Sequence, residues 1–222
     1  MLYWGMRKSV RILIVGLSVF SGSLIASVDA YGQAHNYINS RRSGTVSHVF
    51  VTQSVDGEFG RFNTSGKETT AEGTISTSSA PYWQGFGIGS SVGIEVLKFI
   101  QFNAGHTFVN MRNKNDGLEK IDGSRLNGGA RFVFTAPVAN LEAGGGILAS
   151  RMDYTKRLEA ATFYGSGYYY TLGLNYFISS QVSFFGNAKM NHENLVRNSG
   201  SSVTTSMSTD TTLLGFGFTL WL

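Results

Sequence analysis

Residues 85–111 read GFGIGSSVGIEVLKFIQFNAGHTFVNM and alternate between two kinds of side chain. In the first half, apolar residues recur at every second position, with Gly, Ser and Glu between them. A period of two places successive side chains on opposite faces of an extended strand, whereas a helix needs a period near 3.6. The stretch therefore predicts two β-strands joined by a short link near residues 98–100. The apolar face of the first strand consists of Phe86, Ile88, Val92, Ile94 and Val96.

The same alternation continues on both sides of this stretch, and it predicts eight strands in total. The other segments that carry it are 45–54, 124–135, 140–150, 166–177, 181–193 and 213–222. The links near 98–100, 135–139 and 178–180 are short, whereas those near 55–81, 114–123, 155–165 and 194–208 are long and rich in Gly, Ser, Thr, Asn and Asp. Eight strands with short turns at one end and long loops at the other are typical of an all-β, antiparallel, up-and-down transmembrane barrel.

The beginning of the chain has the features of an export signal. Arg7, Lys8 and Arg11 precede an uncharged, mainly apolar run over 12–26, which is followed by small residues. The run is shorter than the ~20 residues that a membrane-spanning helix needs. We therefore predict a signal peptide over residues 1–30, with cleavage after residue 30 or after residue 34.

Two further segments complete the predicted domain organisation. Residues 31–43 form a short periplasmic segment, and residues 44–222 form the barrel. Loss of residues 1–30 lowers the formal net charge from +4 to +2, because three basic residues and Asp29 leave with the signal. The mature chain is therefore nearly balanced in charge, and we predict no nucleic-acid partner.

Composition distinguishes a membrane barrel from a soluble one of the same strand number. Charged residues make up only 14% of the chain, below the roughly 25% of soluble domains. A soluble barrel exposes Lys and Glu on its non-apolar face, but here that face holds Gly, Ser, Thr and Asn, which suit a narrow interior. The apolar face then contacts lipid. We predict an aromatic girdle near the strand ends, formed by Tyr82, Trp83, Tyr168, Tyr170 and Tyr176.

The N-terminal signal, the hairpin over 85–111 and the ending LLGFGFTLWL (213–222) resemble the small outer-membrane β-barrel superfamily. That superfamily includes the transmembrane domain of outer-membrane protein A, the OmpX-like proteins and the opacity-type adhesins. The resemblance covers roughly residues 44–222 and implies a location in the bacterial outer membrane, in contact with outer-membrane lipid and lipopolysaccharide. It also implies that the barrel-assembly machinery reads the last strand. The residues that this signal would use are Phe216, Phe218, Leu220, Trp221 and Leu222, although the chain ends on Leu instead of the usual aromatic.

Five charged residues fall on the face assigned to the lumen: Glu95, Arg125, Arg131, Glu142 and Lys189. A charge in a narrow interior must be paired, because burying it alone costs several kcal/mol. We favour a set of ion pairs that plugs the lumen. A narrow porin-like channel for small solutes stays an alternative.

Signals for catalysis are weak, and we predict no enzyme activity, no cofactor and no metal site. The glycines of 85–89 recur at a period of two and precede no helix, so they do not form a dinucleotide-binding loop. His192 is the one plausible general base, but the adjacent Glu193 points to the opposite face of its strand. A lipid A-modifying hydrolase is therefore kept as an alternative only. His106 is an exception to the pattern, because it is a polar residue on the face that is predicted to contact lipid.

The long outer loops are where a surface function is expected, because loops on a rigid scaffold commonly carry binding residues. Aromatic and arginine side chains usually anchor such contacts. The candidate anchors in the first and third loops are Phe59, Arg61, Phe62, Phe163 and Tyr164. We predict a non-enzymatic protein with a structural or adhesion-like role and an extracellular ligand bound through these loops.

Overall fold

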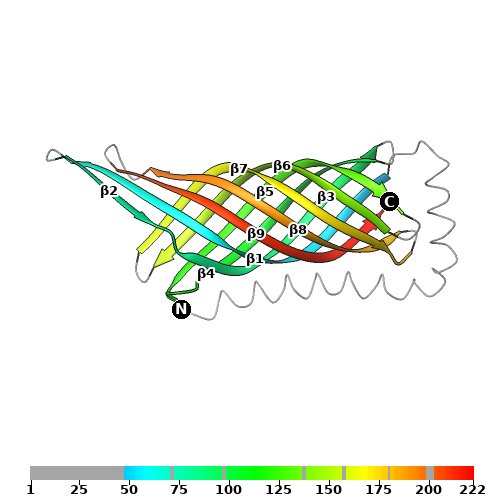
Figure 1. The fold of residues 1–222 in the computed structure, drawn as a ribbon, viewed down its shortest axis with the longest axis horizontal. Helices are drawn as coiled ribbons and strands as arrows, with labels where there is room; N and C mark the ends of the chain where they lie inside the picture. Colours follow the sequence, from blue (N-terminus) through cyan, green and yellow to red (C-terminus); the bar gives the residue numbers. More distant parts are fainter. Residues whose placement is uncertain are drawn as a thin grey trace.

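A computed structural model describes residues 48–70, 73–96, 99–136, 139–156, 159–179, 181–198 and 203–222. The predicted signal peptide and periplasmic segment lie outside these ranges and stay predictions. Among the described residues, no helix is long and apolar enough to cross a membrane. The strands, shown in Figure 1, are β1 (His48–Thr70), β2 (Gly73–Ser79), β3 (Tyr82–Val96), β4 (Ile100–Asn113), β5 (Glu119–Thr135), β6 (Ala139–Lys156), β7 (Glu159–Phe177), β8 (Val182–Asn198) and β9 (Val203–Trp221).

The strands of the described ranges form one antiparallel barrel, as predicted. Its wall has eight strand positions, which we call staves, and one stave can hold more than one strand. Strands β2 and β3 belong to one stave, because both pair with β1 in the same register: Thr64 lies opposite Ser79, and Arg61 lies opposite Tyr82. The stave is interrupted at Ala80–Pro81. Proline has no backbone N–H to donate, although its carbonyl still accepts a hydrogen bond from the backbone of Phe62 at 3.3 Å.

The barrel closes by pairing of β1 with β9 along nearly the whole length of both strands, from Phe50 opposite Trp221 to Glu68 opposite Val203. The strands are staggered around the barrel. A path that passes from each residue to its paired residue on the next strand starts at Glu58 on β1 and comes back to β1 at His48, a shift of ten residues. A shift of this kind means that the strands are tilted against the barrel axis. The path runs through Glu58, Leu213, Lys189, Thr171, Gly144, Arg131, Gln101, Glu95 and His48.

Side chains alternate between the interior and the exterior along each stave, which confirms the predicted period of two. On β7, for example, Tyr168, Tyr170 and Leu172 are exposed, whereas Tyr169 and Thr171 are buried. One member of the predicted girdle is wrong. Trp83 is only 1% exposed and points into the barrel, because it has the same parity on its stave as Gly85 and Glu95.

The exterior carries a continuous apolar zone, which we call the apolar belt. It includes the outward residues from Leu126 to Phe134 on β5, from Tyr168 to Tyr176 on β7 and from Leu214 on β9 to Leu222 directly after it. Each run matches the roughly 9–11 residues that a transmembrane β-strand needs. An exposed apolar surface of this extent is stable against lipid and not against water. The fold and the belt together indicate that the barrel spans a membrane.

The staves continue beyond the apolar belt at the end opposite the short turns. The predicted long loops at 55–81, 155–165 and 194–208 are therefore wrong in large part, because most of these residues are strand. Strands β2 and β1 extend furthest (Figure 1), and with β9 and β8, which pair in turn beside β1, they form what we call the projecting sheet. Serine and threonine side chains pair across it, as in the 2.7 Å hydrogen bond between Ser65 Oγ and Ser206 Oγ. In the described ranges of these four links, a turn is present in the predicted link at 114–123, over residues 114–118.

Candidate functional site: the closed interior and the outer rim

The interior begins, at the end with the short turns, with three packed aromatic rings. Trp221 lies between Phe50 and Phe177, with centroid distances of 5.1 Å and 5.6 Å. All three side chains are buried. The indole Nε1 of Trp221 donates a hydrogen bond to Ser183 Oγ at 2.9 Å, which satisfies its polar atom. This cluster closes one mouth of the barrel.

A polar cluster centred on Glu142 lies next to the rings. Arg131 Nη1 is 3.1 Å from Glu142 Oε2, so the two form an ion pair across β5 and β6. Gln101 Nε2 donates to Glu142 Oε1 at 3.2 Å and to Glu95 Oε2 at 3.1 Å. The amide of Asn175 also donates to Glu142. Five strands, β3 to β7, are tied together by these contacts.

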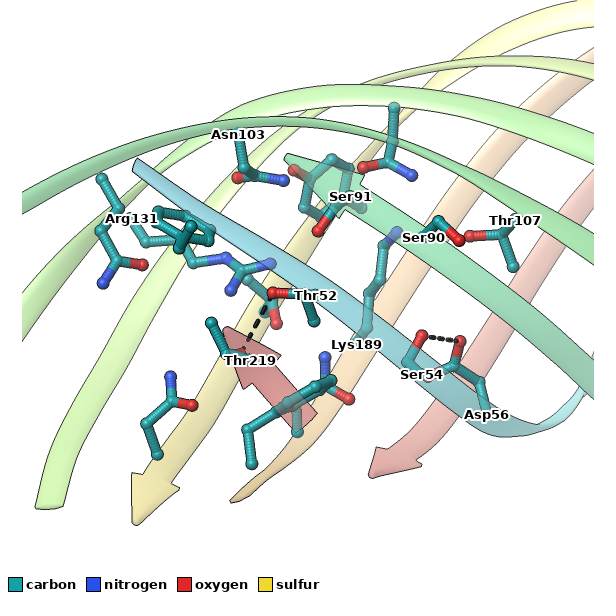
Figure 2. A pocket seen from close by; sticks show the side chains of 18 of the residues that line it. Thr52, Ser54, Asp56, Ser90, Ser91, Asn103, Thr107, Arg131, Lys189 and Thr219 are labelled. Carbon is teal, nitrogen blue, oxygen red and sulfur yellow. Dashed lines mark hydrogen bonds between the residues drawn. The ribbon is translucent and has the colours of Figure 1, made fainter. Parts of the chain in front are cut away.

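The middle of the barrel holds a small polar cavity, shown in Figure 2. Its volume is about 60 Å³, enough for a few water molecules and far below the roughly 300 Å³ of a typical small-molecule pocket. Ser54 donates to Asp56 at 3.2 Å on one side of it. Lys189 Nζ lies 4.1 Å from the centroid of the Tyr169 ring, so a cation–π contact holds the ammonium group.

A network centred on Arg125 lies on the far side of this cavity. Arg125 Nη1 is 2.6 Å from Glu58 Oε2, and Arg125 Nη2 is 2.7 Å from Glu193 Oε2. Arg125 Nε also donates to both oxygens of Glu193, at 3.1 Å and 3.0 Å. The hydroxyl groups of Ser150 and Thr209 donate to Glu193. Five strands supply these side chains, and the three charged ones are at most 1% exposed.

An apolar layer covers the Arg125 network on the side of the projecting sheet. Its members come from every stave and are nearly inaccessible to solvent: Phe62, Trp83, Val109, Met111, Ile121, Met152, Phe163, Leu195 and Met207. Phe62 and Trp83 stack with their centroids 5.5 Å apart. Close-packed side chains of this kind exclude water and solutes. In the described part of the chain, the interior is therefore closed by the aromatic rings at one end and by the apolar layer at the other. The Arg125 network fills the space between them.

The structure places all five predicted lumen charges inside the barrel. It pairs Arg131 with Glu142 but puts Arg125 in a different network. Sequence reasoning missed both partners of Arg125. Glu58 was assigned to a loop, and Glu193 was considered only beside His192. The parity of Glu193, which matches that of Lys189 on the same strand, is the signal that could have placed it in the lumen.

The predicted loop anchors all lie on strands, and two of them face inward. Phe62 and Phe163 are 1% and 4% exposed and belong to the apolar layer, so the prediction that they anchor a surface ligand is wrong. Alternation within the extended strands explains this, since their outward neighbours Arg61 and Tyr164 are exposed. Phe59 is half-buried on the outer face.

The two histidines of the exterior have different surroundings. His192 Nδ1 lies 2.7 Å from Asp210 Oδ1, and its ring packs 5.1 Å from that of Tyr168. Sequence reasoning missed Asp210, which belongs to the next strand. Among the described residues, Asp210 is the side-chain hydrogen-bond partner of His192. His106 faces outward as predicted and packs edge-on against Phe108 at 4.4 Å, in a regular register.

A second polar cluster lies beyond the apolar belt, where β5 begins and β6 ends. Lys156 forms an ion pair with Glu119, and Asn113 Nδ2 donates to Glu119 Oε2 at 2.7 Å. Burial alone would raise the pKa of Glu119, but the hydrogen bonds from Lys156 and Asn113 outweigh it and hold this pKa below its ordinary value of 4.5. The hydrogen bond to Glu119 and its charge raise the pKa of Lys156 above 10.5.

Metal-binding residues do not gather in the described parts of the chain: no group of three His, Cys, Asp or Glu side chains could hold an ion there. On the last strand, Phe216, Leu220 and Leu222 face outward and are exposed, Phe218 is partly exposed, and Trp221 points inward. Their predicted role in assembly stays a prediction.

No family model and no curated protein sequence matches the chain. Solved structures do match. The outer membrane protein OprG from Pseudomonas aeruginosa aligns at 12% identity over 80% of this chain and 97% of OprG, with a TM-score of 0.52. Neisserial surface protein A aligns at 13% identity over 76% and 96%, with a TM-score of 0.48. The outer membrane protease OmpT from Escherichia coli aligns at 8% identity over 79% and 97%, with a TM-score of 0.38. The resemblance to small outer-membrane barrels is thus confirmed for the fold, which does not by itself fix a function.

Proposed function

We propose that this protein is a non-enzymatic outer-membrane barrel with a closed interior, and that its projecting sheet binds a protein partner outside the cell. The proposal rests on the contrast between the interior of the barrel and its projecting sheet. The Arg125 network and the apolar layer fill the interior, whereas the projecting sheet continues past the apolar belt.

The free edge of the projecting sheet supports the kind of partner proposed. In the described part of the chain, β2 pairs with β1 alone, so the backbone groups on its other side are not used by a neighbouring strand. Its sequence, GTISTSS, contains neither proline nor lysine, the residues that commonly protect such edges. An extended segment of another protein can add to an edge of this type through backbone hydrogen bonds.

A test of this role compares bacteria that express the full chain with bacteria that express a shortened variant. In the variant, residues 64–79 are replaced by a two-residue Asn-Gly turn, which removes the projecting end of the first hairpin. Binding to epithelial monolayers and to immobilised extracellular proteins should be lost. The matched control replaces residues 114–118 by the same turn and should keep binding. Equal binding by both variants would refute the role of the projecting sheet.

The closed interior is tested separately, by recording from the purified barrel in planar bilayers. We expect no stable unitary currents, with a general porin in the same membrane as the positive control. Sustained single-channel steps would favour the narrow-channel alternative. Lipid A from cells with and without the gene should give identical mass spectra, and a lost acyl chain would favour the hydrolase alternative.

A further inference from the structure

Three cationic side chains on the outside of the barrel have no ion-pair partner among the described residues: Arg61 on β1, Arg112 on β4 and Lys114 directly after β4. All three are exposed. The neighbouring cations beyond the apolar belt are paired. Lys120 lies 3.0 Å from Asp122, Arg151 lies 3.4 Å from Asp153, and Lys156 contacts Glu119. The three unpaired cations therefore differ from Lys120, Arg151 and Lys156.

The register of β1, β3 and β4 brings these cations together. Arg61 lies opposite Tyr82, and Arg112 lies opposite Gln84, its near neighbour on the same strand. The backbone N–H of Lys114 donates to the carbonyl of Tyr82 at 2.9 Å. Neighbouring strands are about 4.8 Å apart, so the three backbones lie within roughly 10 Å. We call this group, with Tyr82 at its centre, the basic patch.

The side chains of the basic patch point away from the barrel. Phe62, Trp83 and Asn113, the neighbours of Arg61, Tyr82 and Arg112 or Lys114 in sequence, are all buried in the interior. Since side chains alternate along a strand, the patch residues face outward. Lys114 Nζ lies 5.9 Å from the centroid of the Tyr82 ring, so the ring orients the ammonium group.

An apolar surface continues directly from the patch toward the membrane. Phe86 on β3 and Phe108 on β4 are 53% and 63% exposed on the same outer face. Tyr82 is level with Arg61 at the outer end of β3, and the pair formed by Gln84 and Arg112 lies between it and Phe86. The surface is thus cationic above and aromatic below, which matches an amphiphile with an anionic head and acyl chains.

We infer that the basic patch binds a phosphorylated lipid of the outer leaflet. Arginine guanidinium groups donate paired hydrogen bonds to phosphate oxygens, and the lysine adds a third positive charge. The acyl chains of the lipid pack on Phe86 and Phe108. Asp210 lies opposite Arg61 on β9, but its carboxylate contacts His192 at 2.7 Å. This inference does not depend on the role proposed for the projecting sheet.

The test uses the full-length barrel folded in detergent and titrated with bisphosphorylated lipid A, with bound lipid counted by native mass spectrometry. The Arg61→Gln, Arg112→Gln, Lys114→Gln variant removes the patch. The matched control is Lys120→Gln, Arg151→Gln, Lys156→Gln, which removes three paired charges from the same rim. We expect about fivefold weaker binding for each patch charge, roughly 100-fold in all, and a far smaller change in the control.

Three outcomes would overturn the inference. Equal weakening in both triple variants would mean that any rim charge suffices. Equal affinity for dephosphorylated lipid A would mean that the apolar surface binds alone, and equal affinity for inorganic phosphate would mean that the acyl chains take no part. An Arg61→Lys, Arg112→Lys variant keeps the charges and should keep most of the binding. The shift between boiled and unboiled samples on a gel confirms that each variant is folded.

Discussion

Arg125 uses three guanidinium nitrogens to hold two carboxylates that come from other strands of the barrel. Each carboxylate on its own would be a buried charge without compensation, which costs several kcal/mol. The arginine is therefore needed mainly because its removal would leave two buried carboxylates without a counter-charge. This logic separates two kinds of substitution in the network.

The Arg125→Ala variant should lose about 3–5 kcal/mol of unfolding free energy, because Glu58 and Glu193 then lie buried and unpaired. The neutral variant Glu58→Gln, Arg125→Met, Glu193→Gln should lose clearly less, because no unpaired charge is left at the position of this network. Urea unfolding of the barrel in lipid vesicles measures both. Equal losses in the two variants would contradict this account of the network.

Glu119 makes the outer rim sensitive to acid. Its folded-state pKa is below the unfolded value of 4.5, so its contribution to stability is fully present above about pH 4.5 and is lost as the pH falls through the folded pKa. Between pH 6 and pH 3 the unfolding free energy of the native chain should therefore fall more steeply than that of Glu119→Gln. Urea titrations at several pH values give both slopes, and identical slopes would rule the effect out.

The staves of this barrel are longer than the membrane requires. On β1, β8 and β9 the outward residues beyond the apolar belt are mainly polar, yet the strands pair without interruption to Glu68, Asn198 and Val203. A Ser- and Thr-rich segment has the composition of a loop, but threonine suits a pleated strand well and a paired backbone leaves no polar group unsatisfied. The projecting sheet follows from this cross-strand pairing.

Pairing within the projecting sheet can be tested by cross-linking, because the chain contains no cysteine. The Ser65→Cys, Ser206→Cys variant should form a disulfide on mild oxidation, since the two hydroxyl oxygens are 2.7 Å apart. The Ser65→Cys, Ser208→Cys variant is the control, because Ser208 lies opposite Asn63 and is two residues out of register. Mobility on non-reducing gels reports the bond. Equal yields would indicate a loop that moves freely.

At the scale of the whole molecule, an exposed side chain faces lipid within the apolar belt and water beyond it. Leu172 is 55% exposed within the apolar belt, and Tyr164 is 57% exposed on the same strand beyond it. In a soluble barrel, the two positions would tolerate a charge equally well. In a membrane barrel they differ, because only one of them faces hydrocarbon.

The Leu172→Arg variant should therefore cost about 2–4 kcal/mol of unfolding free energy in lipid vesicles, whereas Tyr164→Arg should cost about 0–1 kcal/mol. Both variants keep the interior intact, so the difference reports depth alone. The same pair of urea titrations serves as the measurement. Equal costs would contradict the position assigned to the apolar belt.

The fold was predictable to a large extent, and the interior contacts only in part. Alternation in segments such as 124–135 and 166–177 identified the staves and their lipid face, because a period of two survives in any register. Pairing was not predictable in this way. The contact between Arg125 and Glu193 joins strands far apart in the sequence, and the wall must close with its shift of ten residues before the two side chains can meet.

By itself, the sequence determined the eight staves, the outward apolar face and the confinement of Arg125, Arg131, Glu142, Glu95 and Lys189 to the lumen. These properties depend only on the parity of each residue along its own strand. The tertiary structure alone decided which charges pair, where the strands end and that Phe62, Trp83 and Phe163 seal the interior. These properties depend on how neighbouring strands align and on how much space the closed barrel leaves, and neither quantity is local to a segment.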